Sequence, residues 1–119
     1  MAWHFSSDRP VYIQIADRIT RSVLSGEYKP GEQIPTVRQL ALEAAVNPNT
    51  VQRAFAELEN VGIVISKGTS GRFVTESNES IEQSRNKLAK KIVCDFIKNT
   101  NSLSLTKEQV ISMIEEVAE

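Results

Sequence analysis

Residues 36–61, TVRQLALEAAVNPNTVQRAFAELENV, contain two helix starts close together. Thr36 and Gln39 have the spacing of a capping box, in which the hydroxyl accepts from the N–H of the fourth residue and the Gln side chain bonds back to the first N–H. Asn47 followed by Pro48 is a stronger start, because Asn is a favoured N-cap and Pro at the first helical position gives up an N–H that has no partner there. The stretch therefore predicts two helices, at about 36–44 and 48–61.

The flanking sequence adds a helix before this pair and a hairpin after it. Apolar residues recur at helical spacing between Pro10 and Gly26, which predicts a first helix over about 10–25. Past the helix pair come three β-formers, the turn cluster at 67–71 and Phe73-Val74, a pattern typical of a hairpin. This order is that of a winged helix-turn-helix, whose third helix fits a DNA major groove. We therefore predict a mostly α-helical fold with a small β-hairpin.

The predicted third helix has an apolar face and a polar face that is nearly free of acid. At 100° per residue, the packing face collects Val51, Ala54, Phe55, Leu58 and Val61. The opposite face carries Asn49, Gln52, Arg53, Ala56 and Asn60. Asn and Gln can bond adenine edges and Arg can fork onto guanine, so this face suits base reading. Ordinary solvation also produces a polar outer face, and for any single residue that interpretation is equally open.

Candidate DNA contacts come from both predicted helices and from the hairpin. Asn49, Gln52 and Arg53 are the predicted base readers. The other candidates are Thr36, Arg38, Asn47, Thr50, Lys67, Gly68, Ser70, Gly71 and Arg72. Those at the second helix and the hairpin would be positioning contacts to the DNA backbone. Thr36 and Asn47 are also interpreted as caps, Arg38 as a bridge between helices, and the glycines as turn formers.

Residues 76–119 predict a two-helix tail after a domain at 1–75. A polar lead-in precedes an apolar stripe made by Ile81, Leu88, Ala89, Ile92, Val93, Phe96 and Ile97. Thr106 and Gln109 form a second capping box before Ile111 and Ile114. Because a monomer rarely exposes so much apolar surface, we predict a homodimer. The predicted dimer contacts are Leu88, Ile92, Phe96, Ile111 and Ile114; the alternative is that the stripes pack together and onto the first helix.

Composition excludes several classes of protein. The chain has 119 residues, 40% hydrophobic and 24% charged, which suits one globular domain plus an appendage. One Cys and one His can form neither an internal disulfide nor a metal site by themselves. No nucleophile, base and orienter pattern is visible, so we expect no enzyme, no metal and no cofactor. No apolar stretch approaches the roughly 18 residues of a membrane span, so we expect a cytoplasmic protein without membrane contact.

Charge is nearly balanced in both parts of the chain. Residues 1–75 hold eight Lys/Arg against seven Asp/Glu, and residues 76–119 hold six against eight, so the split is +1 and −2. Between residues 44 and 56 the sole charged side chain is Arg53. The placement of the charged residues, rather than the net charge, therefore favours DNA binding. The nearly neutral charge predicts weak non-specific binding to DNA and an affinity that depends on dimerisation.

Four motifs together resemble the DNA-binding domain of GntR-type bacterial transcription regulators. They lie at 34–41, 46–51, 53–59 with Gly62, and 67–74. The Asn-Pro-Asn-Thr stretch and the two-helix tail are similar to the YtrA-like subfamily, and the 44 residues from 76 to 119 cannot build the effector domain of larger subfamilies. The resemblance implies a homodimer that represses from a double-stranded, pseudo-palindromic operator until a signal releases it. In many relatives a base-reading Arg occupies the place of Pro48, so readout here shifts to Asn49, Gln52 and Arg53.

Two functions of other classes stay open from the residues alone. One is a winged-helix module that docks a protein, and the other is a sensor of a small ligand near Trp3 or the tail. Trp3, His4 and Phe5 are interpreted as an aromatic lid on the core, or as the lining of a ligand pocket at a dimer interface. A small-molecule effector of unknown identity is thus an open partner. Cys94 is interpreted as an inert thiol.

Overall fold

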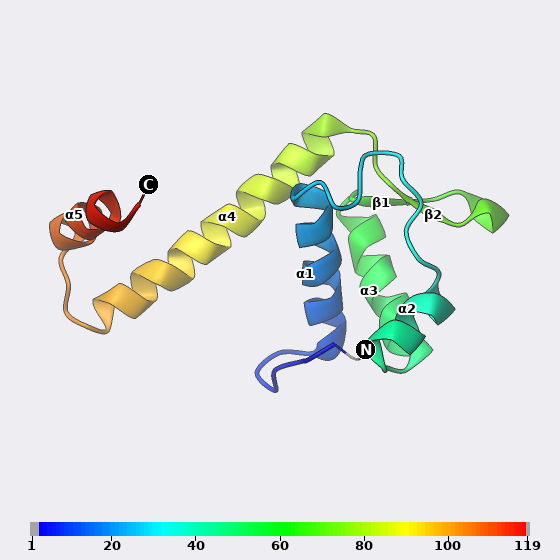
Figure 1. The fold of residues 1–119 in the computed structure, drawn as a ribbon, viewed down its shortest axis with the longest axis horizontal. Helices are drawn as coiled ribbons and strands as arrows, with labels where there is room; N and C mark the ends of the chain where they lie inside the picture. The colour runs from blue at the N-terminus through cyan, green and yellow to red at the C-terminus, as the bar shows by residue number, and fades with distance from the viewer. Residues whose placement is uncertain (1–2, 119) are drawn as a thin grey trace. The chain divides into compact units, whose positions relative to one another are not determined.

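The computed structural model describes residues 3–118 and confirms a mostly helical fold with a two-stranded hairpin (Figure 1). The elements in chain order are α1 (Val11–Leu24), α2 (Val37–Ala44), α3 (Pro48–Asn60), β1 (Val64–Ser66), the 3-10 turn η1 (Gly68–Ser70), β2 (Arg72–Val74), α4 (Asn78–Asn101) and α5 (Lys107–Val117). The chain forms two compact units, one up to residue 85 and one from residue 86 onward. Each unit is described separately below.

The core of the first unit lies between α1, α2 and α3. Each helix contributes one apolar face, as the predicted periodicity requires. The buried helical residues are Ile15, Ala16, Ile19, Val23, Leu40, Ala41, Ala44, Val51, Ala54, Phe55 and Leu58. The prediction was wrong for Val61, which is 40% exposed, because α3 ends at Asn60 and Val61 follows it as the C-cap. The other four predicted packing residues of α3 are confirmed as buried.

Side-chain caps set the geometry of the helix pair. Thr36 Oγ1 accepts from the N–H of Gln39 at 3.1 Å, and Gln39 Oε1 accepts from the N–H of Thr36 at 2.9 Å, which confirms the capping box. Asn47 Oδ1 accepts from the N–H of Asn49 at 2.7 Å and starts α3. Between the helices Ala45 adopts the left-handed conformation, with φ 59° and ψ 50°. This residue makes the tight turn that directs α3 away from α2.

The hairpin is a wing, and a third segment of the chain pairs with it in a way that the sequence did not predict. β1 and β2 pair antiparallel, with Val64 opposite Val74. The segment before α2 runs along the other edge of β2: Gln33 pairs with Phe73, and the N–H of Ile34 donates to Arg72 O at 3.0 Å. The wing is therefore anchored on both edges of β2.

The first turn of α4 belongs to the first unit. Ile81, which the apolar pattern grouped with the tail stripe, is 7% exposed and packs in the core of that unit. In the second unit the predicted capping box of Thr106 and Gln109 is confirmed, and Val110 is buried. Large apolar side chains of α4 and α5 are exposed, among them Ile92 at 45% and Phe96 at 42%. Within residues 3–118, no helix is both long and apolar enough to cross a bilayer.

Candidate nucleic-acid interface

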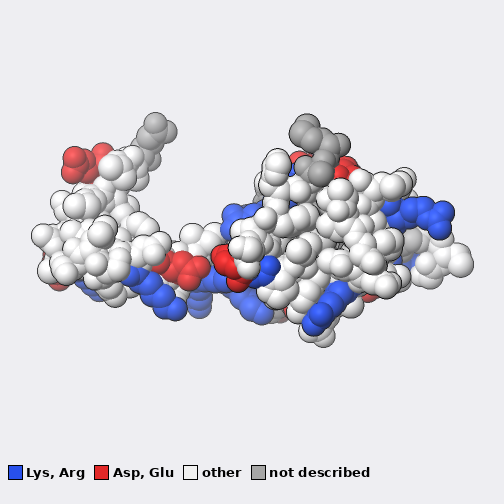
Figure 2. Space-filling model, turned by 90° about the horizontal axis from the view of Figure 1, so that it is seen from below, with Lys and Arg blue, Asp and Glu red and all other residues white. Residues whose placement is uncertain are grey.

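The polar face of α3 is exposed to solvent. Asn49, Gln52, Arg53 and Ala56 are all exposed, and Thr50 is half-buried. Ala56 keeps the middle of the face low, so a flat surface could approach the longer side chains around it. On the face drawn in Figure 2, Lys and Arg side chains lie in several groups, and Asp and Glu side chains lie next to some of them. The arrangement suits recognition by a few placed groups more than by bulk charge.

Arg53 is held against α1 by an aromatic ring. Its guanidinium carbon lies 4.0 Å from the centroid of the Tyr12 ring, within the range of a cation–π contact. Asn49, Thr50 and Arg53 line a shallow pocket of about 320 Å³ together with Tyr12 and Val11. Three predicted DNA contacts are thus brought together at the N-terminal end of α3, next to α1.

Arg72 connects the wing to α3. Its Nη2 donates to Gln52 Oε1 at 3.3 Å, and its guanidinium carbon lies 5.0 Å from the centroid of the Phe55 ring. The Nε atom is buried and lies 3.7 Å from Glu59 Oε2, an ion-pair distance that is too long for a hydrogen bond. These contacts place Arg72 beside a predicted base reader and neutralise an acid of α3. The position of Gln52 therefore depends on the wing as well as on its own helix.

The turn of the wing carries the other candidate residues. Lys67 is exposed, with Nζ 4.8 Å from the centroid of the Phe73 ring. Ser70 O accepts from Gln33 Nε2 at 2.9 Å, which ties the turn to the segment before α2. Gly71 has φ 109°, and a Cβ there would lie 2.6 Å from Gln33 Nε2. The backbone conformation favours glycine at this point, and a Cβ would in addition have to displace the end of the flexible Gln33 side chain. Gly68, with φ 61°, provides the other bend.

The start of α2 supplies two further candidates. Thr36 and Arg38 are exposed. The Thr36 oxygen is used as a cap, which leaves its hydroxyl hydrogen available as a donor. Among residues 3–118, no hydrogen bond or ion pair joins Arg38 to another side chain, so the predicted bridge between helices is not formed there. Asn47 acts as the N-cap of α3, as its alternative interpretation held.

Three residues that shape this face were missed as site residues. Tyr12 lies within the apolar pattern of the first helix, and neither it nor Gln33 or Glu59 was predicted as a site residue. Tyr12 contacts Arg53, Gln33 bonds the turn of the wing, and Glu59 pairs with Arg72. In each case the partner lies far away in the sequence or on another element. No local signal marks such contacts, because periodicity and caps report neighbours within about one turn.

Three packed helices, a tight turn before the third and a wing fastened to it define a winged helix-turn-helix, a DNA-binding class. The family described as "Bacterial regulatory proteins, gntR family" matches residues 11–74. The chain belongs to the GntR family and is an HTH-type DNA-binding transcriptional regulator, not an enzyme.

Relatives extend the similarity beyond the winged domain. The uncharacterised HTH-type transcriptional regulator YhcF of Bacillus subtilis is 37% identical over 115 residues, which cover 97% of this chain and 95% of YhcF. The repressor YtrA of Bacillus subtilis is 39% identical over 71 residues, 60% of this chain and 55% of YtrA. A GntR family regulator from Listeria monocytogenes is similar in structure, with a TM-score of 0.86, 36% identity, and coverage of 95% of this chain and 99% of the other.

Proposed function

We propose that this protein is a repressor that binds a pseudo-palindromic operator as a homodimer. The observation that carries the proposal is the exposed end of α3, where Asn49, Gln52 and Arg53 stand around the small side chain of Ala56. YtrA of Bacillus subtilis is described as a repressor. A structurally similar DNA-binding domain of AraR, 26% identical with a TM-score of 0.56, is described in complex with an operator.

The proposed roles follow from where each group lies. Asn49, Gln52 and Arg53 read base edges in the major groove, since their side chains are exposed and carry the required donors and acceptors. Contacts to the DNA backbone come from Thr36, Arg38, Thr50, Lys67 and Ser70, with Gly68 and Gly71 allowing close approach of the wing. Arg72 has a positioning role, because it bonds Gln52. Asn47 sets the start of α3.

Exposed apolar side chains of α4 and α5 support the homodimer. Four large apolar side chains are 42–46% exposed, those of Ile92, Phe96, Ile111 and Ile114, and Leu88 is half-buried. A second copy that covered these groups would remove them from water and gain roughly 25 cal/mol per Å² of apolar area. Two-fold symmetry would then place two α3 helices about 34 Å apart, one turn of DNA.

Footprinting on the upstream region of the protein's own operon is the direct test. We expect two protected half-sites about one helical turn apart and lower output from a reporter promoter that contains them. A logarithmic plot of affinity against salt should have a modest slope: with Arg38 and Lys67 each neutralising one phosphate per protomer, the dimer neutralises about four, and the slope is about −3.6. The absence of any protected site at low salt would refute operator binding.

Dimerisation is tested by one charge placed on α4. Phe96→Glu should sediment as a monomer and bind the operator at least about 100-fold more weakly, because the second half-site no longer shares the effective concentration of a dimer. Lys98→Glu, on the same helix and also exposed, is the control and should stay dimeric. If Phe96→Glu stays dimeric at low micromolar concentration, these residues do not form the interface.

A further inference from the structure

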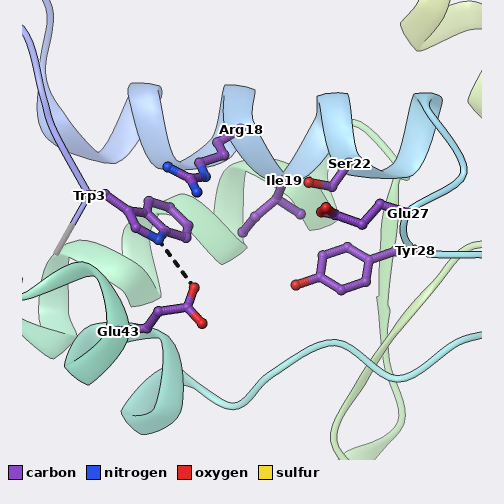
Figure 3. A pocket seen from close by; sticks show the side chains of 7 residues that line it. All are labelled: Trp3, Arg18, Ile19, Ser22, Glu27, Tyr28 and Glu43. Carbon is purple, nitrogen blue, oxygen red and sulfur yellow. Dashed lines mark hydrogen bonds between the residues drawn. The ribbon is translucent and has the colours of Figure 1, made fainter. Parts of the chain in front are cut away.

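A pocket of about 300 Å³ lies between the N-terminal segment, α1 and α2. Its lining contains none of the residues proposed above to contact DNA. Figure 3 shows that Arg18, Ile19 and Ser22 come from α1, Glu27 and Tyr28 from the loop that follows, Glu43 from α2, and Trp3 from the segment before α1. All belong to the first unit, so the pocket is complete within a single winged domain.

Two aromatic side chains, Trp3 and Tyr28, line the pocket, and contacts hold Trp3 in place. Trp3 Nε1 donates to Glu43 Oε2 at 3.2 Å, which orients both the indole ring and the carboxylate. The Arg18 guanidinium carbon lies 3.9 Å from the Trp3 ring centroid. Ile19 is buried and provides an apolar floor. In Figure 3 the Tyr28 hydroxyl points toward the space beside Trp3 and Glu43.

Negative charge prevails in this pocket. Two carboxylates, Glu27 and Glu43, face one guanidinium, that of Arg18, which already lies against the Trp3 ring. Burial raises the pKa of the Tyr28 phenol above its ordinary value of 10.0, and nearby carboxylates raise the pKa further, whereas Arg18 lowers it. The phenol oxygen therefore lies in a net negative potential, which disfavours an anionic ligand and favours a cationic one.

We propose that this pocket binds a small organic cation, with a protonated amine or guanidinium on a short apolar body. Carboxylates accept the strong, charge-assisted hydrogen bonds that such a group donates. The face of the Tyr28 ring attracts cations, and Ile19 offers an apolar surface to the body of the ligand. The volume lies at the lower end of the range for ligand pockets, which limits the ligand to a compact molecule.

Trp3 makes the proposal directly measurable. The chain has one Trp, so intrinsic tryptophan fluorescence reports on the pocket alone. The full-length protein is titrated with agmatine, with choline and, as an anion of similar size, with succinate, at constant ionic strength. We expect a saturable change in Trp3 emission with agmatine, a weaker one with choline, whose quaternary nitrogen has no N–H to donate, and none with succinate. Saturation by succinate, or no saturation by agmatine up to about 10 mM, would overturn the proposal.

Charge-neutral variants separate binding in the pocket from general attraction to an acidic protein. Glu27→Gln and Glu43→Gln should each weaken agmatine binding at least about tenfold, since each removes one charged acceptor. Gln at position 43 can still accept from Trp3, so the ring stays oriented. Glu57→Gln on α3 removes the same charge outside the pocket and should bind as the parent does.

Urea unfolding checks that the variants fold, and agmatine-induced shifts in thermal unfolding give a readout independent of Trp3. Equal agmatine affinity in the parent and both pocket variants would refute the site.

Discussion

The contact between Tyr12 and Arg53 leads to a prediction about specific DNA binding. We expect Tyr12→Leu to weaken operator binding about 5- to 30-fold. A cation–π contact at an exposed site contributes roughly 0.5–1 kcal/mol, and the 4.0 Å distance between the Arg53 guanidinium and the ring is within its range. A dimer contains two such contacts, so about 1–2 kcal/mol is lost. The physical reason is that the ring holds the flexible Arg53 guanidinium in place at the exposed end of α3. Without the ring, the entropy lost when this side chain becomes ordered on DNA reduces the free energy of binding.

Fluorescence anisotropy with a labelled operator duplex and with a random duplex measures this effect. Tyr12→Phe retains the ring face and should bind the operator as the parent does, whereas Tyr12→Leu should lose affinity for the operator and little for random DNA. Tyr12 is half-buried against the core, so the free energy of unfolding is measured for both variants to confirm that they are folded at the assay temperature. Tighter operator binding by Tyr12→Leu would show that the ring withholds Arg53 from DNA, and the reasoning would be wrong.

Three other predictions concern stability. Ala45→Gly should raise the free energy of unfolding by about 0.5–1 kcal/mol, because Ala45 has φ 59°, a left-handed conformation that glycine adopts without strain. A lower free energy of unfolding in urea would contradict this. Thr36→Ala should lower the free energy of unfolding by about 1 kcal/mol, and Thr36→Ser should lower it much less, because Ser keeps the hydroxyl oxygen that caps α2. Equal losses in the two variants would count against the cap. The raised pKa of Tyr28 means that the folded state binds more protons than the unfolded state above the ordinary value of 10.0. Stability should therefore fall as the pH rises past about 10, and the fall should be smaller in Tyr28→Phe; identical pH profiles would refute the assignment.

Much of the fold could be predicted because its signals are local. The caps at Thr36 and Asn47 act within one helical turn, so the residues that form them are neighbours in the chain. Apolar periodicity identified the buried faces of the three helices for the same reason. Val61 is the exception: the angle on a helical wheel placed it inward, but α3 ends one residue earlier. A helix end is the least certain part of such a prediction because terminal turns have fewer hydrogen bonds.

The sequence by itself determined the class of this protein: the helix order, the tight turn, the wing and the exposed polar residues of α3 all follow from short-range chemistry. Only the tertiary structure decided how the candidate groups are held. Three contacts join residues that are 20 to about 40 positions apart in the chain: Arg53 with Tyr12, Arg72 with Gln52, and Trp3 with Glu43. Whether such side chains meet depends on how helices and strands pack across a common core, and no periodic pattern within one element encodes that distance.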